Sequence, residues 1–288
     1  MADGSVIDIK AQPLYRIQTD LSEIDWMYGY TRWGPGNVRW GLPVGKISLW
    51  AGEKGVGKSR ATIEVAKSVA QVKNESGQHY PVVYFCLEEE IESFADNAKR
   101  DGTILPRHFY ASNERNVEKQ IEIIRKYIGQ VIFIDSINQV EGYSENSSSR
   151  VKKVIELYRK IAVERNAHII LISMLNANGD TKGSTTLPHL VDNEFSVKRS
   201  DEQGEFEVRV GKKHRGGRTG DEFYSVWRHC ENNAEIISAN RTKDKIWADS
   251  HGHQVFDIND LARKAVENAR AEENRKKGFL SKVFSLGG

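Results

Sequence analysis

The sequence predicts an α/β fold with a mostly parallel central sheet covered by helices and antiparallel strands at one edge. From residue 46 to residue 173, short apolar runs alternate with amphipathic stretches, a pattern typical of parallel sheets that are buried on both faces. After about residue 190, apolar and polar side chains alternate with period two. This second pattern favours neighbouring antiparallel strands.

The individual elements follow from the same patterns. Short apolar runs rich in β-branched residues predict parallel strands at residues 46–51, 82–87, 131–135 and 168–173. Apolar residues with helical spacing predict helices at residues 59–73, 91–100, 116–129 and 150–165. Period-two alternation predicts edge strands at residues 194–199, 205–212 and 222–227.

Three parts are expected along the 288 residues: an arm over 1–13, one core domain over 14–245, and a charged helix and tail over 246–288. The tail carries an apolar helical face made of Phe279, Leu280, Val283 and Phe284. Either this face docks a protein partner, or it covers the core of its own chain.

Composition excludes several classes of protein. A formal net charge of +2 means that any nucleic-acid surface must arise from local clustering. The two cysteines, Cys86 and Cys230, are too few for a four-thiolate zinc site, and nothing argues for a disulfide between them. No apolar run is long enough to span a bilayer and no secretory signal is visible, so we expect no membrane partner and a cytoplasmic location.

The strongest motif is GEKGVGKS, residues 52–59, which fits the pattern G-x-x-x-x-G-K-[ST] between an expected strand and an expected helix. We call residues 52–59 the phosphate loop. Its backbone N–H groups and the helix start are expected to hold the phosphates of ATP. Lys58 would reach the β- and γ-phosphates, and the Ser59 hydroxyl would ligate Mg²⁺. The expected nucleotide-binding residues are Gly52, Glu53, Lys54, Gly55, Val56, Gly57, Lys58, Ser59 and Arg60.

Two acidic residues follow buried strands and complete the expected chemistry. Asp135 ends the run VIFID, where a carboxylate would hold Mg²⁺ through water. Glu88 comes first after the run VVYFCL, so it would lie in the crevice at the carboxyl ends of the strands. There it is the best candidate to orient or deprotonate an attacking water. Glu89 and Glu90 are expected to be solvated acids at a helix start.

These pieces resemble the RecA-fold ATPases, in particular the RadA/Sms branch and the DnaB-type helicase core. The resemblance covers about residues 14–230 and includes GEKGVGKS, VVYFCLEE, VIFIDSI and TLPHLVD. It implies a RecA-like P-loop core, ATP and Mg²⁺ as cofactors, and Glu88 as the catalytic glutamate. Relatives carry further modules at both ends, so from this sequence we expect a motor core with a short tail.

The basic stretch GKKHRGGRTG, residues 211–220, is predicted to be a loop because so many glycines oppose a helix. Its part KHRGGRTG is similar to the K-x-R-x-G-x-T-G pattern of DnaB-like cores and the K-N-R-F-G motif of RadA. In those proteins the lysine and arginine contact the γ-phosphate of a neighbouring subunit. The resemblance therefore implies that Lys213 and Arg215 act across a subunit interface, where a cation stabilises the charge that develops on the phosphoryl oxygens.

The chain departs from the family at the end of its fourth apolar run. Relatives usually have histidine or glutamine as a polar sensor at the position of Met174. A thioether is too weak an acceptor to report a γ-phosphate. Either Ser173 or Asn176 takes this role, or coupling is weaker than in relatives. Asn97 also replaces an arginine common in the RadA helix after the glutamate.

Two polar loops, residues 141–150 and 176–189, correspond by position to the loops that line the channel of the family's rings. The first offers Arg150 and Lys152, and the second offers Lys182 among glycines and threonines. A few cations and backbone N–H groups suffice to track single-stranded DNA without reading its sequence. The alternative is that both segments are ordinary polar surface loops that do not bind DNA.

The leading expectation is a homo-oligomeric ring, a hexamer in the family, that hydrolyses ATP and translocates on single-stranded DNA as a helicase or branch-migration motor in replication or recombination. One alternative is a filament-forming recombinase. A second alternative is an ATP-dependent switch or assembly protein that does not act on nucleic acid.

Overall fold

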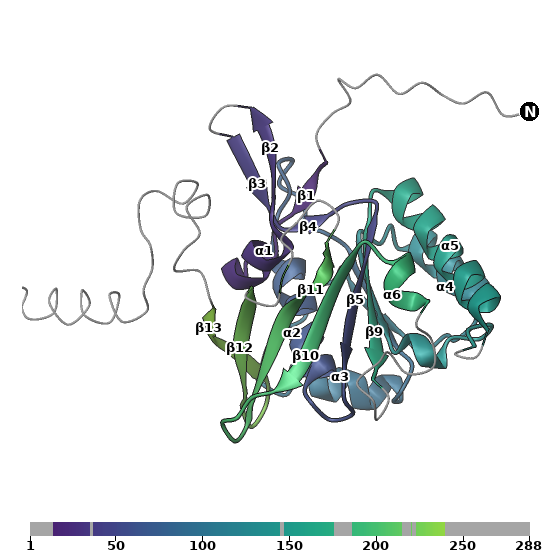
Figure 1. Ribbon diagram of the computed structural model, residues 1–288. Helices are drawn as coiled ribbons and strands as arrows, with labels where there is room; N and C mark the ends of the chain where they lie inside the picture. The colour runs from purple at the N-terminus through teal and green to yellow at the C-terminus, as the bar shows by residue number, and fades with distance from the viewer. Residues whose placement is uncertain are drawn as a thin grey trace, which may run out of the picture. The chain divides into compact units, whose positions relative to one another are not determined.

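A computed structural model describes residues 14–34, 37–144, 147–175, 186–214, 220 and 223–239. At its centre is a nine-stranded sheet with the order β13-β12-β11-β10-β5-β9-β8-β6-β7 (Figure 1). The arm 1–13 and the tail 246–288 lie outside the described residues, so their roles stay predictions. Within the described part of the chain, no helix has both the length and the apolar character needed to cross a bilayer.

Five of the six mutually parallel strands occupy one half of this sheet. They are β5 (Lys46–Gly52), β9 (His168–Met174), β8 (Val131–Asp135), β6 (Val82–Cys86) and β7 (Phe109–Ser112). The other half begins with β10, which is parallel to β5, and continues with three antiparallel pairings. Its strands are β10 (Asn193–Arg199), β11 (Glu205–His214), β12 (Tyr224–His229) and β13 (Ala234–Ala239). The predicted fold class is therefore confirmed.

The helices cover the two faces of the sheet. They are α2 (Lys58–Gln71), α3 (Ile91–Lys99), α4 (Val117–Lys126), α5 (Ser148–Arg165) and the short α6 (Leu187–Leu190). Alternate side chains of β5, β6, β8 and β9 form one buried cluster with α4 and α5. The side chains between them point to the opposite face, where α2 packs. Burial on both faces explains why these strands appear as nearly continuous apolar runs.

The sequence analysis missed several small elements. They are β7, β13, the helix α1 (Ser22–Tyr28), the hairpin of β2 (Tyr30–Gly34) and β3 (Asn37–Trp40), the pair of β1 (Arg16–Ile17) and β4 (Leu42–Pro43), and the 3-10 turn η1 (Ile137–Gln139). Strand β7 has only four residues, FYAS, so it is too short to give a clear strand pattern. Helix α1 has seven residues, too few for a clear helical period.

The prediction that residues 211–220 form a loop was partly wrong. Strand β11 continues to His214, so Lys213 lies in a strand rather than in a loop. His214 pairs with Asn193 of β10, and this pairing extends the ladder past Gly211. Glycine opposes a helix more strongly than it opposes an edge strand, which explains the error. Arg215 lies outside the described residues.

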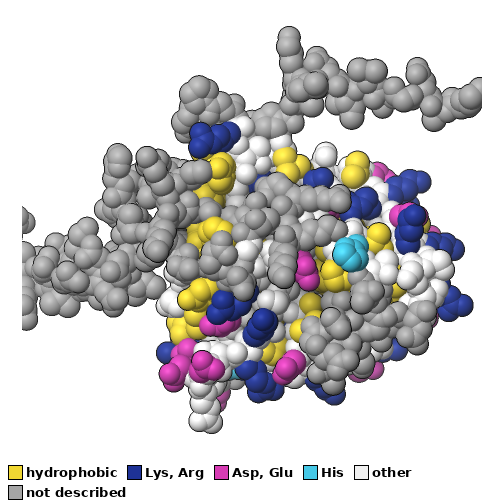
Figure 2. All heavy atoms as spheres, viewed as in Figure 1, with side chains coloured by type: hydrophobic (Ala, Val, Ile, Leu, Met, Phe, Trp, Pro, Cys, Tyr) yellow, Lys and Arg dark blue, Asp and Glu magenta, His cyan; other side chains and the backbone are white. Residues whose placement is uncertain are grey.

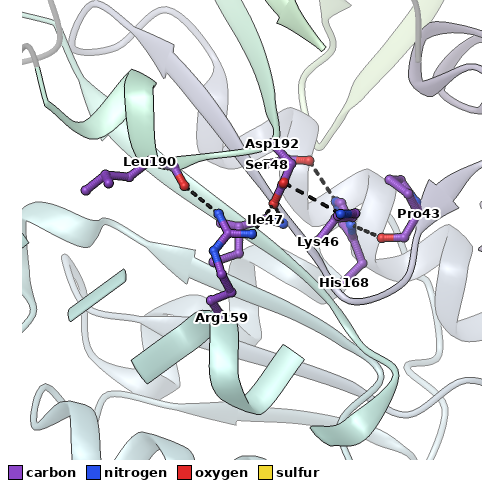
Figure 3. A network of polar contacts seen from close by, with 8 residues as sticks. All are labelled: Pro43, Lys46, Ile47, Ser48, Arg159, His168, Leu190 and Asp192. Carbon is purple, nitrogen blue, oxygen red and sulfur yellow. Dashed lines mark hydrogen bonds and ion pairs between the residues drawn. The ribbon is translucent and has the colours of Figure 1, made fainter. Parts of the chain in front are cut away.

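A buried polar network fastens β5 to its neighbours (Figure 3). Asp192, just before β10, accepts from the Ile47 N–H at 3.1 Å and from Arg159 Nη1 of α5 at 2.8 Å. On the next strand, the His168 ring contacts Ser48 Oγ at 2.8 Å and the Pro43 carbonyl at 2.8 Å. Burial lowers the pKa of His168 to about 4, so this ring is neutral at pH 7. The network fixes the strand that leads into the phosphate loop.

Asp192→Ala is expected to lower the free energy of unfolding by about 1–3 kcal/mol, because it leaves the buried Ile47 N–H without its acceptor and removes the ion pair with the half-exposed Arg159. Urea denaturation measures this change. Glu164→Gln serves as the control, since the Arg125–Glu164 pair lies on the surface and its loss should change stability little. Equal effects of the two substitutions would contradict the role of the network.

Candidate active site

A cavity of about 430 Å³ lies at the carboxyl ends of β5, β6, β8 and β9, where the phosphate loop turns into α2. Its lining comes from separate parts of the chain: Lys54, Gly55, Gly57, Lys58, Ser59, Arg60, Glu88, Asp135, Ser136, Met174 and His229. Open α/β sheets bind ligands in this kind of crevice. The structure thus brings together the loop lysine, the hydroxyl and both carboxylates that the sequence singled out.

The phosphate loop has the backbone of an anion cradle. Gly55 and Gly57 have φ angles of +73° and +117°, which only glycine adopts readily. A Cβ on Gly57 would lie 2.7 Å from His229 Cε1 and 2.8 Å from Phe206 Cε1, so no larger residue fits. A Cβ on Gly52 would meet the Val197 carbonyl at 2.4 Å. The loop is therefore held tightly on its β10–β12 side, and its backbone N–H groups at the start of α2 suit phosphate oxygens.

Lys58 begins α2 and is 7% exposed. Its Nζ donates to the carbonyls of Gly52 at 2.8 Å and Glu53 at 2.6 Å. Burial lowers its pKa, while the carboxylates of Asp135 and Glu88 oppose that shift. The ammonium is thus held against the loop by neutral acceptors, and a phosphate oxygen would be a stronger partner than either carbonyl.

Ser59 and Asp135 form the part of the cavity that fits a hard cation. The Ser59 hydroxyl hydrogen-bonds the Asp135 carboxylate, and Tyr84 Oη donates to Asp135 Oδ2 at 2.9 Å. Burial raises the pKa of Asp135 to about 6, against the effect of these two hydrogen bonds. A carboxylate and a hydroxyl beside a phosphate cradle are ligands that Mg²⁺ accepts while keeping several waters. These residues therefore fit a magnesium–nucleotide complex.

Glu88 is exposed at the mouth of the cavity, directly after β6. Its Oε1 accepts from Ser136 Oγ at 2.5 Å. The contact links the end of β6 to the residue after Asp135, so the two carboxylates lie on neighbouring strand ends. Glu89 instead accepts from Ser93 and Asn97 of α3, as expected for an acid at a helix start.

The sequence analysis missed Ser136 and His229. His229 ends β12, far along the chain from the phosphate loop, and reaches the cavity only because β10, β11 and β12 add to the sheet beside β5. One signal was available in the sequence. His229 continues the inward side of Ser225 and Trp227 in a strand with period two, so it belongs to the buried face.

The predicted sensor position lies at the cavity. Met174 lines it, whereas Ser173 is fully buried and its hydroxyl donates to Asn138 Oδ1 at 3.2 Å. The other candidate, Asn176, lies outside the described residues. The geometry therefore argues against Ser173 as a residue that contacts phosphate.

A second cavity of about 190 Å³ adjoins the first and shares Ser59 and Arg60 with it. Its other lining residues are Ile63, Glu64, Glu89, Asn97, Arg100, Asn232 and Asn233. The Arg60 guanidinium donates to the Cys230 carbonyl at 3.1 Å and so bridges α2 to the β12–β13 turn. Asn97, noted for replacing an arginine, lies here between Glu89 and Arg100.

The remaining loop residues are more peripheral. Glu53 is largely exposed, and its Oε2 lies 3.9 Å from Arg199 Nε. The Val56 side chain is only 1% exposed and is buried on the inner side of the loop. Neither of them lines the cavity in the described structure. Their contribution to a bound nucleotide would come from the backbone.

The predicted DNA-contacting cations lie on another part of the molecule. Arg150 and Lys152 are exposed at the start of α5, and Lys152 lies 3.8 Å from Glu156. Figure 2 shows Lys and Arg side chains along the right-hand edge of the molecule, over α4 and α5. Lys182 lies outside the described residues. The two loops approach each other at their ends, where Ser148 Oγ and Thr186 Oγ1 are 2.9 Å apart.

Comparison with known proteins gives this geometry a context. A family model described as an AAA domain matches residues 36–179, half of the chain. The DNA repair protein RadA of Aquifex aeolicus is 28% identical over 156 residues, which cover 53% of this chain and 33% of that protein. RadA of Halalkalibacterium halodurans is 25% identical over 183 residues, which cover 62% and 36%. The matched segment thus spans about a third of these relatives.

Gly57→Ala is expected to weaken nucleotide binding by more than about tenfold, because the new methyl group must displace His229 or Phe206 and adopt a strained φ. Titration with a fluorescent ATP analogue measures the affinity. Gly77→Ala is the matched control, since Gly77 has a φ of +76° but open space around it, far along the chain from the loop. Similar losses in both variants would contradict the fit described for Gly57.

Proposed function

The chain belongs to the AAA-domain family and has a RecA-like fold related to RadA, and from this premise we propose that it is an ATPase acting on DNA in repair or recombination. In finer terms, it hydrolyses ATP between subunits of a ring and translocates on single-stranded DNA. The observation that carries the proposal is the cavity in which Lys58, Ser59, Asp135 and Glu88 converge.

Each residue has a role that its position supports. Lys58 and the loop N–H groups bind the β- and γ-phosphates, and Ser59 with Asp135 holds Mg²⁺, which neutralises charge on the phosphates. Glu88 lies 2.5 Å from Ser136 and is exposed to solvent, so it can orient a water for attack on the γ-phosphate. We assign the nucleoside to the second cavity, because this cavity shares Ser59 and Arg60 with the first.

The direction of β11 supports a site that two subunits share. Val197 pairs with Gly52, and Asn193 pairs with His214, so β11 carries Lys213 away from the phosphate loop of its own subunit. Four residues along a strand and two strand spacings separate Lys213 from Gly52 by roughly 13 Å and roughly 10 Å, respectively. A lysine side chain does not span this distance. This separation supports the proposal that Lys213, and Arg215 two residues later, serve a neighbour's γ-phosphate.

Arg150 and Lys152 provide the expected contact with single-stranded DNA. They are exposed and lie at the start of α5, whose first turn touches the end of the second polar loop. A contact of this kind neutralises phosphates without reading bases, and it releases counterions. Salt dependence therefore separates a DNA motor from an ATPase switch that does not bind nucleic acid.

The central experiment compares the rate of ATP hydrolysis with and without single-stranded DNA and measures the mass of the protein in solution with ATP. A DNA-stimulated rate and the mass of a closed oligomer are expected. Particle images with long filaments instead of rings would favour a recombinase. ATP hydrolysis that DNA leaves unchanged would favour the switch.

Arg215→Ala is expected to reduce turnover by about 10³-fold or more and to leave ATP binding largely intact, by analogy with other arginine fingers. Steady-state hydrolysis and nucleotide titration measure the two effects. Lys198→Ala, an exposed cation on β10, is the control and should change neither. If Arg215→Ala weakens only DNA binding, the assignment to the γ-phosphate is wrong.

Lys152→Ala is expected to weaken binding to single-stranded DNA and to reduce the slope of log K against log salt by about 0.7, the value for one lost phosphate contact. Fluorescence anisotropy over a salt series gives the slope. Lys160→Ala is the matched control, since this lysine is also exposed and on α5 but lies about two helical turns beyond Lys152, away from the first turn. An unchanged slope for Lys152→Ala would remove this residue from the DNA surface.

A further inference from the structure

Among the residues that line the first cavity, His229 is the one that comes from the antiparallel half of the sheet. It ends β12, the second strand of a hairpin formed by β11 and β12, which we call the finger hairpin. The same hairpin carries Lys213 near its opposite end. The finger hairpin therefore extends from His229, beside the phosphate loop of its own subunit, to Lys213, which we propose to serve the site of the neighbouring subunit.

The His229 ring lies between the phosphate loop and β11. A ring N–H hydrogen-bonds the Val56 carbonyl of the loop. The ring also packs on Phe206 at the start of β11, with centroids 4.7 Å apart. It lies so close to Gly57 that a Cβ there would be 2.7 Å from His229 Cε1. A displacement of the loop toward the ring would therefore press on His229 and, through it, on Phe206.

Charge is not the means of this coupling. Burial lowers the pKa of His229, and the nearby cation Arg60 lowers it further, so the ring is neutral at pH 7. Its Nδ1 is buried and has no hydrogen-bond partner in the part of the chain that the structure describes. The other ring nitrogen is thus the donor to Val56, and the ring acts through packing and one hydrogen bond.

The finger hairpin is well suited to transmit such a displacement. The His229 N–H donates to the Gly204 carbonyl at 2.8 Å, and the β11–β12 ladder runs from Glu205 paired with Arg228 to Arg209 paired with Tyr224. The hairpin is also bonded on both sides, to β10 and to β13. Packed ribbons of this kind move as units rather than bend continuously.

We propose that His229 is a positioning residue that ties the phosphate loop to the base of the finger hairpin, so that nucleotide in one subunit sets the position of the Lys213 that the hairpin offers to the next subunit. This inference rests on the proposed function, because it requires a site shared between subunits. It adds a structural link through which nucleotide binding at one ATP site affects the ATP site of the neighbouring subunit.

The test mixes subunits that hydrolyse ATP with Lys58→Ala subunits at constant total protein. The rate of ATP hydrolysis is measured for each mixture and divided by the rate of the same variant without Lys58→Ala subunits. Lys58→Ala subunits keep their fingers, so without coupling the rate falls in proportion to the fraction of intact subunits. With coupling, subunits that cannot respond to nucleotide also hinder their neighbours, and the rate falls more steeply.

When all subunits carry His229, the hydrolysis rate is expected to fall more steeply than in proportion as Lys58→Ala subunits are added. When all carry His229→Phe, the rate is expected to fall only in proportion. This variant keeps a ring on Phe206 but cannot donate a hydrogen bond to Val56. His229→Gln retains a donor at the corresponding position and should restore the steep fall. Arg228→Gln is the matched control in the same strand, since it loses only an exposed pair with Glu205 and should remain steep.

A steep fall that persists in His229→Phe would overturn this inference and leave the shared site intact. A proportional fall when every subunit carries His229 would overturn the inference as well. In that case, hydrolysis regained on mixing Lys58→Ala with Arg215→Ala would show that the shared site itself survives, whereas a mixture no more active than either variant alone would show that the shared site of the proposed function fails.

Discussion

The close contact between the phosphate loop and the antiparallel strands is the constraint on which the site depends. Gly57 at φ +117° leaves no room for a side chain, because His229 and Phe206 occupy the space beside it. Gly52 is pressed equally closely against Val197 of β10. The loop is therefore shaped on one side by the parallel strands that carry the carboxylates, and on the other by strands that follow much later in the chain.

The buried polar network around β5 also helps to hold the phosphate loop in place. Asp192 and His168 fix β5 to β9, α5 and the start of β10, so the strand that delivers the loop cannot slide against its neighbours (Figure 3). Burying these polar groups has an energetic cost that their mutual hydrogen bonds offset. With β5 fixed in this way, Glu88 and Asp135 at the carboxyl ends of β6 and β8 keep their positions relative to Lys58.

Sequence reasoning recovered the parallel half of the fold because strands buried on both faces must be apolar throughout. It also predicted that Lys58, Ser59, Asp135 and Glu88 lie together, and all four line one cavity, since each has a position that a motif or a strand end defines. It could not find β7, because a strand of four residues is too short to give a clear pattern. It missed His229 because its period-two pattern indicates only the buried face of β12, whereas its place in the cavity follows from the order of the strands.

The central claim is that one hydrolytic site is built from two subunits. Complementation between Lys58→Ala and Arg215→Ala tests it most directly, because each variant alone lacks one half of every site. In a random equal mixture, about a quarter of the sites pair an intact loop with an intact finger, so hydrolysis should rise above that of either variant alone, to at most about that fraction of the unaltered rate. A mixture no more active than the two variants measured separately would contradict the claim.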